Sequence, residues 1–284
     1  MTLRLALLAI ALLVAPPACA ADRWFLTSDG IRLHYTDTGR GRTLVLVPGW
    51  TMPAWIFAAQ IADLSRQYRV IAFDPRGQGD SEIASSGYEP VRRGEDIADL
   101  LRVLGSDKPV VAGWSLGVLD ILAYVHNHGG ERLAGLVLVD NSIGEEQPPP
   151  PPQPPEPAGH RHLGPVPREI SVRRFVRGMF LRQIARSYLE RLAEAALRTP
   201  AWAAASLLAY PFPRTYWRDA VYSAGVPVLY LVRPRLAAQA ANLVQHDPDA
   251  ESVVLQGVGH AMFVDDPVRF NGLVKDFIRR RIWP

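Results

Sequence analysis

Short apolar runs alternate along the chain with stretches in which apolar residues return every three or four positions. The runs are apolar on both faces of an extended chain, which is typical of strands buried in a parallel sheet. Between them, Ile97, Leu100, Leu101 and Leu104 have the spacing of one helix face. The pattern predicts strands joined by helices, with the strands at residues 43–47, 69–73, 109–112, 136–139, 226–232 and 252–255.

The beginning of this pattern has a different character. Two extended segments, 24–27 and 31–35, flank Asp29-Gly30, a pair that is typical of a two-residue β-hairpin. A hairpin followed by alternating strands and helices indicates an α/β fold. We therefore expect a doubly wound, mostly parallel sheet with an antiparallel start.

The alternation is interrupted near the middle of the chain. Residues 148–157 contain eight prolines, which exclude a helix or a central strand and predict an extended, proline-rich link over 148–167. Amphipathic helices follow over 168–222, and we interpret them as a helical cap inserted into a core formed by 21–147 and 223–284. Some cap side chains are expected to face the site below. The cap residues that favour an apolar acyl or alcohol group of a substrate include Phe175, Phe180, Tyr188 and Trp202.

The first 20 residues have the three regions of a secretory signal peptide. Arg4 is their only charge, an unbroken apolar run follows, and Ala18-Cys19-Ala20 has the small residues of a cleavage site. The apolar run is shorter than the ~20 residues that span a bilayer. We expect cleavage after Ala20 and a mature protein that is periplasmic or secreted. Cleavage would also remove Cys19, the only cysteine of the chain.

Charge and composition exclude several other classes of protein. The net charge is +3, from 31 basic and 28 acidic residues, and the arginines are scattered, so no nucleic-acid partner is expected. No later segment is apolar for long enough to span a membrane. With 284 residues, of which 48% are hydrophobic, the chain can bury one large core.

The clearest chemical motif is Gly113-Trp114-Ser115-Leu116-Gly117, between a predicted strand and a predicted helix. In this context G-x-S-x-G predicts a sharp turn that exposes a serine nucleophile. The serine is forced into a strained backbone geometry, and larger side chains at the two glycines would collide. The turn also places the backbone N–H of Leu116 at a helix N-terminus, where a developing negative charge is stabilised.

Three more motifs, together with this one, give the chain a specific resemblance. Asp74-Pro75-Arg76-Gly77-Gln78-Gly79-Asp80-Ser81 follows one predicted strand, Pro48-Gly49-Trp50 follows another, and Gly259-His260 lies beyond the last. The four resemble the nucleophile turn, the D-x-R-G-x-G-x-S loop, the oxyanion loop and the late histidine turn of the α/β-hydrolase family. The resemblance runs from about Trp24 to Ile282. It implies that Asp74, Arg76 and Asp80 brace a loop beside the site.

A serine hydroxyl needs a base to take its proton during attack, and His260 is the candidate. It follows Ser115 in the chain, the order expected of this fold. The other histidines are predicted to be structural. His160 and His162 would need further ligands to hold a metal, so neither a metal site nor a cofactor is expected.

The remaining site residues follow from the resemblance. The oxyanion hole takes one backbone N–H from Leu116, and the resemblance assigns the second to Trp50. In much of the family an acid follows the strand equivalent to 226–232, but residues 233–238 here contain no carboxylate. Asp140, directly after the strand at 136–139, is the predicted substitute; the alternative is an aspartate that merely caps the loop. If Asp140 is not the acid, Asp247, Asp249 or a Ser–His pair takes its place.

These residues predict a cofactor-free hydrolase that cleaves a small, apolar carboxylic ester through an acyl-enzyme. A serine at position 115 argues against haloalkane dehalogenases and epoxide hydrolases, which the resemblance associates with aspartate there. Lactonase, amidase, C–C hydrolase and perhydrolase activities stay open, because all could use the same three residues. A small-ligand receptor of the same fold, without catalytic function, is the alternative from another class.

Overall fold

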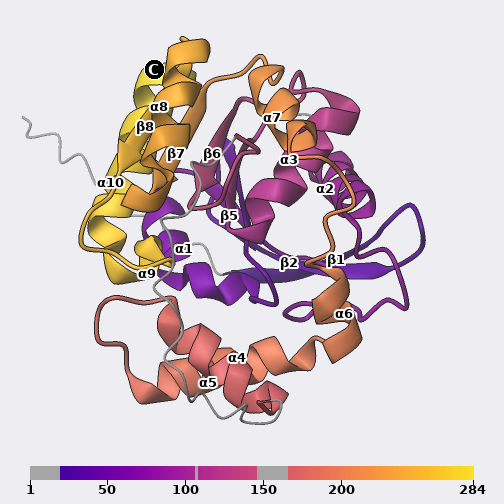
Figure 1. Ribbon diagram of the computed structural model, residues 1–284. Coiled ribbons are helices and arrows are strands. Elements are labelled where there is room, and N and C mark those ends of the chain that lie inside the picture. The colour runs from indigo at the N-terminus through magenta and orange to yellow at the C-terminus, as the bar shows by residue number, and fades with distance from the viewer. Residues whose placement is uncertain (1–19, 106–107, 146–165) are drawn as a thin grey trace, which may run out of the picture.

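The computed structural model describes residues 20–105, 108–145 and 166–284, and an eight-stranded sheet is its centre (Figure 1). The spatial order is β1-β2-β4-β3-β5-β6-β7-β8, with antiparallel pairing at β1–β2 and β2–β4 and parallel pairing elsewhere. The predicted sheet with an antiparallel start is therefore confirmed. The strands are β1 (Ala21–Leu26), β2 (Arg32–Thr38), β3 (Thr43–Val47), β4 (Arg69–Asp74), β5 (Val110–Trp114), β6 (Gly135–Val139), β7 (Val228–Val232) and β8 (Ala250–Val254).

Helices cover both faces of the sheet. The core on one face includes residues of α2, α3, α7 and α8, and the core on the other includes residues of α1, α9 and α10. Strands β3, β5, β6 and β7 are buried along their whole length, as their apolar runs predict. The helices are α1 (Ala58–Leu64), α2 (Pro90–Leu104), α3 (Leu116–His128), α4 (Arg168–Gly178), α5 (Arg186–Arg198), α6 (Ala201–Ser206), α7 (Thr215–Tyr222), α8 (Ala237–His246), α9 (Met262–Asp265) and α10 (Pro267–Phe277), with short 3-10 helices η1 (Ala54–Phe57) and η2 (Pro234–Leu236) and a π-helix η3 (Ile278–Ile282).

The helices α4, α5 and α6 lie together below the sheet in Figure 1 and form the cap region. Two hydrogen bonds are among the contacts that tie this region to the core. The indole Nε1–H of Trp50 donates to the carbonyl of Ala204 at 2.7 Å, and the backbone N–H of Ala261 donates to the carbonyl of Met179 at 2.9 Å. Helix α7, although inside the predicted cap range, packs on α3 of the core. The predicted link and the signal peptide fall almost wholly outside the described residues.

The hairpin at the start of the sheet was predicted with too short a loop. Leu26 pairs with Arg32, so residues 27–31 form the connection instead of Asp29-Gly30 alone. The Thr27 hydroxyl bonds the Asp29 carboxylate and accepts the backbone N–H of Ile31, which closes this wider loop. The Asp29 carboxylate also accepts a hydrogen bond from the guanidinium of buried Arg76, so tertiary contacts select the longer turn.

A buried histidine–aspartate pair joins β2 to the end of β4. His34 Nδ1 lies 2.7 Å from Asp74 Oδ2, and its Nε2 lies 3.2 Å from Asp22 Oδ1. Burial of the ring opposes its protonation. The hydrogen bonds to Asp74 and Asp22 and the charges of Asp74 and Asp80 outweigh burial and raise the pKa of His34 above its ordinary value.

We expect this pair to make the stability of the protein depend on pH. Because the pKa is raised in the folded state, the stabilisation is complete below the unfolded value of ~6.5 and is lost as pH rises through the folded value. Urea unfolding of the wild type and His34→Gln should therefore differ most near pH ~5.5, with the gap closing toward alkaline pH. If the difference in the free energy of unfolding between the wild type and His34→Gln is the same at acidic and alkaline pH, the pair does not cause the pH dependence.

Candidate active site

The serine turn has the strained geometry that its glycines predict. Ser115 lies between β5 and α3 with φ 55° and ψ −120°, in the left-handed region that few non-glycine residues adopt. A Cβ at Gly113 would lie 2.5 Å from the carbonyl oxygen of Gly117, and a Cβ at Gly117 would lie 2.4 Å from that of Val47. Only glycine allows the start of α3 to approach both strands this closely. The approach sets Ser115 at the carboxyl end of the sheet.

His260 lies in the loop between β8 and α9, and its Nε2 is 2.9 Å from Ser115 Oγ. The indole Nε1–H of Trp114 donates to the His260 carbonyl at 2.8 Å, and the two rings lie 5.1 Å apart. Buried Asp265 accepts the backbone N–H of Gly259 at 2.6 Å and those of Leu181 and Arg182, and so ties the histidine loop to the base of the cap. The loop is thus fixed by the core and by the cap.

Asp140 directly follows β6 and completes a chain of hydrogen bonds. Its Oδ2 lies 2.7 Å from His260 Nδ1, and its side chain is fully buried. An ionised carboxylate only accepts, so Nδ1 must carry the proton and leave Nε2 free to accept from the Ser115 hydroxyl. Burial raises the pKa of Asp140, but the hydrogen bonds from His260 and Arg233 outweigh it and hold the pKa below its ordinary value.

The alternative acids lie elsewhere. Asp249 precedes β8, whereas His260 follows that strand. The Asp249 carboxylate pairs with Arg281 at 2.9 Å. Asp247 accepts the backbone N–H of Asp249 in the same turn. The structure therefore brings Ser115, His260 and Asp140 together and leaves the two alternatives at the opposite end of β8.

The loop of Gly49 and Trp50 lies against the serine. A Cβ on Gly49 would come within 2.8 Å of Ser115 Cβ, so a larger residue would displace the loop. Within the described part of the chain, the backbone N–H groups of Trp50 and Leu116 form no hydrogen bond. Both lie next to Ser115 and are free to donate to an oxygen held there. Their role in an oxyanion hole stays a prediction.

Gln78 shapes this loop, a role that the sequence analysis missed. Its Oε1 accepts the backbone N–H of Thr51 at 2.8 Å, and its Nε2 donates to the carbonyls of Gly49 and Met52. Thr51 itself has φ 58°. The signal in the sequence was a single amide between the two glycines of the Asp74–Ser81 motif.

The other residues of this motif have different surroundings. Asp74 accepts the backbone N–H groups of Ala54 and Asp80 and binds His34, and buried Arg76 binds Asp96. Asp80 is exposed and pairs with Arg198 of α5 at 2.8 Å. The first two hold the loop on the core, and the third connects it to the cap.

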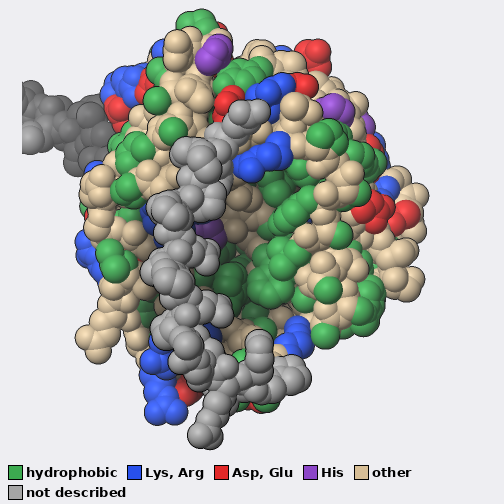
Figure 2. Space-filling model, in the orientation of Figure 1, with side chains coloured by type: hydrophobic (Ala, Val, Ile, Leu, Met, Phe, Trp, Pro, Cys, Tyr) green, Lys and Arg blue, Asp and Glu red, His purple; other side chains and the backbone are tan. Residues whose placement is uncertain are grey.

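An apolar pocket of about 440 Å³ lies between the cap and the Trp50 loop. The Phe175 ring contacts the Trp50 ring edge-on at 5.1 Å there. Figure 2 shows a hollow in this face of the molecule, lined largely by hydrophobic side chains. The residues around the pocket are Trp50, Arg168, Ser171, Val172, Phe175, Ala201, Ala204, Ala205 and Leu208.

Of the four cap aromatics predicted to favour an apolar substrate group, only Phe175 lines this pocket. Tyr188 packs edge-on against Trp55 and Phe180, and half-exposed Trp202 packs on Tyr88 of the core. These three join the cap to the core or to itself, and whether they contact a substrate stays a prediction.

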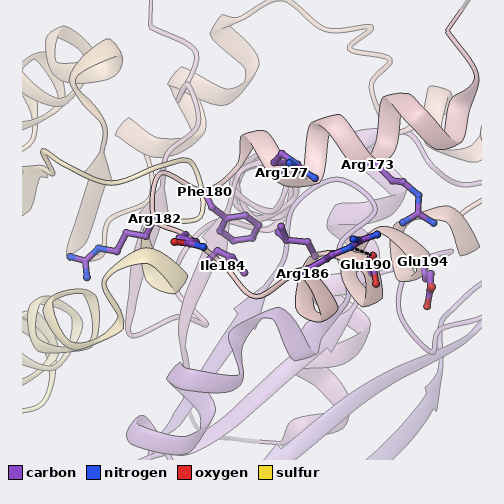
Figure 3. A pocket seen from close by; sticks show the side chains of 10 residues that line it. Arg173, Arg177, Phe180, Arg182, Ile184, Arg186, Glu190 and Glu194 are labelled. Atoms are coloured by element: carbon purple, nitrogen blue, oxygen red, sulfur yellow. Dashed lines mark hydrogen bonds and ion pairs between the residues drawn. The ribbon is translucent and has the colours of Figure 1, made fainter.

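A larger groove of about 850 Å³ lies on the cap itself (Figure 3). Its lining residues all come from α4, α5 and the segment between them, and they include Phe180 and several arginines. Arg186 pairs with Glu190 across one turn at 2.6 Å, and Arg173 pairs with Glu169. These pairs partly neutralise the groove. Neither the groove nor the apolar pocket is lined by Ser115, His260 or Asp140, but the pocket adjoins the serine through Trp50, which follows Gly49.

One group among the described residues has the spacing of metal ligands: His34, Asp74 and Asp80. Both ring nitrogens of His34 already face carboxylates, and Asp74 accepts two backbone N–H groups. These hydrogen bonds account for the cluster without an ion. His160 and His162 lie outside the described residues. No helix in the described ranges has the length and apolar character needed to cross a bilayer.

Known proteins resemble this chain in sequence and in fold. The model of the alpha/beta hydrolase family matches residues 44–273. The chain is 36% identical over 117 residues to a soluble epoxide hydrolase from Corynebacterium sp. strain C12, covering 40% of this chain and 41% of that protein. It is 35% identical over 113 residues to a non-heme haloperoxidase from Rhodococcus erythropolis, covering 39% and 41%. The matches thus span well under half of these curated relatives.

Among solved structures, an esterase from Rhodococcus sp. ECU1013 superposes with a TM-score of 0.75. It is 24% identical, and the match covers 92% of this chain and 99% of the esterase. At this identity the likeness shows a shared fold and no more. The fold agreement extends over nearly the whole chain.

Proposed function

The chain belongs to the alpha/beta hydrolase family, and from this premise we propose that it is a serine hydrolase that cleaves carboxylic esters through an acyl-enzyme. One observation carries the proposal: Ser115 Oγ, His260 and Asp140 form a continuous chain of hydrogen bonds of 2.9 and 2.7 Å. This is the arrangement of a nucleophile, a general base and an orienting acid.

In the first half of the proposed reaction, Ser115 Oγ attacks the ester carbonyl carbon while His260 Nε2 takes the hydroxyl proton. The carbonyl oxygen becomes an oxyanion beside the backbone N–H groups of Trp50 and Leu116, which stabilise it. Asp140 holds the imidazole and stabilises the imidazolium without taking its proton. The C–O bond then breaks, the alcohol leaves with the proton from His260, and the acyl group stays on Ser115.

In the second half, a water attacks the acyl carbon while His260 accepts one of its protons. The bond to Ser115 Oγ breaks, the proton returns to the serine, and the carboxylic acid leaves. The apolar pocket beside Trp50 supports a small apolar substrate, since it can take an acyl or alcohol chain.

Turnover of short p-nitrophenyl esters tests this proposal. We expect hydrolysis that is unaffected by EDTA and abolished by a fluorophosphonate, with the label on the peptide that contains Ser115. Activity that is lost in EDTA and restored by zinc contradicts the mechanism. A folded protein that binds but never cleaves any ester or lactone of a broad panel points to the receptor alternative.

A perhydrolase is a second candidate, favoured by the match to a non-heme haloperoxidase. Hydrogen peroxide in place of water would attack the acyl-enzyme and release a peracid, which oxidises halide ions without a metal. Bromination of monochlorodimedone by bromide in acetate buffer with hydrogen peroxide, measured beside ester hydrolysis, separates the two activities.

We further propose that the protein is exported after cleavage behind Ala20. Strand β1 begins at Ala21, so this cleavage leaves the first strand of the sheet intact. In a bacterium that exports the full chain, we expect the mature protein to begin at Ala21 and to lie outside the cytoplasm. N-terminal sequencing checks this, and soluble cytoplasmic protein that begins at Met1 refutes it.

We expect the cap to determine which esters are cleaved. Ala205 of α6 lines the apolar pocket and is exposed, so Ala205→Phe can fill the pocket without overpacking the core. Octanoate esters should lose about 10-fold or more in kcat/KM relative to acetate esters. Ser206→Phe, on the same helix but outside the pocket, is the matched control. Equal losses for both esters mean that the pocket does not select the substrate.

A further inference from the structure

A cation stands where much of the family has its acid. Arg233 is the first residue after β7, and it binds Asp140 twice. Its backbone N–H donates to Oδ1 at 3.0 Å, and its Nε–H donates to Oδ2 at 2.6 Å. The two bonds hold both carboxylate oxygens, so the carboxylate cannot rotate away from His260. Arg233 is 26% exposed and Asp140 is 0% exposed.

The same Oδ2 also accepts a hydrogen bond from the Nδ1–H of His260, so the imidazole and the guanidinium share one oxygen. Arg233 Nη2 lies 3.5 Å from Nδ1. Both nitrogen atoms are hydrogen-bond donors when Asp140 is ionised, so they form no hydrogen bond with each other. A fixed positive charge at this distance disfavours the charged form of the imidazole.

We propose that Arg233 is a positioning residue that locks the Asp140 carboxylate and, through its charge, keeps His260 in its neutral base form at lower pH. The inference rests on the proposed function, because a neutral His260 is what ester cleavage needs. An acid without this cation would favour protonation of the resting imidazole and remove the base. Arg233 thereby offsets the charge of Asp140 while fixing its position.

The other groups around His260 differ from Arg233 in distance or in charge. Arg235 is half-exposed and reaches the Asp140 carbonyl at 3.3 Å and Oδ2 at 3.8 Å, so solvent screens its charge. Asp265 is occupied by backbone N–H groups of the histidine loop and the cap. Tyr230 donates to the Asn141 carbonyl, and burial raises its pKa, so it stays neutral. Ser115 and Trp114 are uncharged neighbours.

The pH profile of kcat/KM for a p-nitrophenyl ester tests the inference. Arg233→Gln should move the acid limb upward by about 0.5–1 pH unit, because the opposing charge is gone. Arg233→Lys keeps the charge and should restore the limb to within about 0.2 unit. Arg218→Gln removes an arginine of α7 that pairs with neighbouring Asp219, and it controls for net charge.

Two outcomes overturn the inference. Either the acid limb of the kcat/KM profile stays in place in folded Arg233→Gln, or the lysine and glutamine variants shift it equally. NMR titration of the His260 ring in the full chain, assigned with His260→Gln, measures the same midpoint without turnover. If no ester is cleaved, the proposed function fails, but the NMR midpoints of the wild type and Arg233→Gln still decide the role of Arg233.

Discussion

Replacing Ser115 with alanine is expected to lower kcat for ester hydrolysis by about 10⁶-fold, the loss seen when a nucleophile of this kind is removed. The substitution removes only the hydroxyl group, whose hydrogen bond to His260 Nε2 is 2.9 Å long. The backbone N–H of Ser115, which donates to the Val139 carbonyl at 2.9 Å, is kept. The turn should therefore fold as before, and binding of a product acid should persist.

Thermal unfolding and ester kinetics of the same preparation check this prediction. Ser115→Gly is a useful companion, since it removes the hydroxyl and also the strain of φ 55°. We expect it to be as inactive as the alanine variant and more stable by about 1 kcal/mol. If the alanine variant keeps more than about a hundredth of the activity in a preparation free of wild-type enzyme, Ser115 is not the nucleophile.

The central strands could be predicted because their sequences are unambiguous. A strand buried on both faces must be apolar throughout, and the runs at β3, β5, β6 and β7 have this pattern. The edge strand β8 is only half-buried, and its predicted range, like those of β5 and β7, differs from the observed one by up to two residues. The family resemblance is confirmed by the match over residues 44–273.

The hairpin loop could not be predicted locally. Asp29-Gly30 has the signature of a tight turn, but Asp29 binds Arg76 and the backbone N–H of Ser28 donates to Asp99 of α2. These partners lie far away in the sequence, and they favour a loop over residues 27–31. Propensity was overridden by tertiary ion pairs.

The three residues that the structure brings together could be selected from the sequence, whereas the residues that support them could not. Motif spacing identified Ser115 and His260, and the missing carboxylate after β7 directed attention to Asp140. The sequence also shows arginines in that loop, but nothing local indicates that Arg233 binds Asp140. That contact arises because β6 and β7 are neighbours in the sheet, so the residues after them meet. Gln78 was missed for the same reason, since its three partners lie on another loop.

Asp140→Asn is expected to lower kcat by about 10⁴-fold, as the equivalent change does in a related triad. Asp140 accepts three donors: the backbone N–H and Nε–H of Arg233 and Nδ1–H of His260. An amide has one acceptor oxygen, so its NH₂ must face Arg233 or His260. In the place of Oδ2 it faces both His260 and the Nε–H of Arg233, so Nδ1 becomes the acceptor and the proton lies on Nε2, where it blocks the base. In the place of Oδ1 it opposes the backbone N–H of Arg233, another donor.

The substitution should also lower stability, since the guanidinium of Arg233 loses its buried counter-charge. We expect a loss of about 1–3 kcal/mol near neutral pH, because Arg233 is partly exposed and solvent weakens the penalty. The folded pKa of Asp140 is depressed, so its contribution is present above the unfolded value of ~3.9 and disappears as pH falls through the folded value. The stability gap between wild type and variant should close in acid.

Asp249→Asn is the matched control, because it removes the carboxylate that pairs with Arg281 before β8, away from His260. It should keep near-normal kcat and lose at most about 1 kcal/mol. Kinetics and urea unfolding of both variants, measured on preparations with identical circular dichroism, give the answer. A folded Asp140→Asn enzyme with near-normal kcat removes Asp140 from the mechanism, leaves His260 without its acid, and makes the system a Ser–His pair.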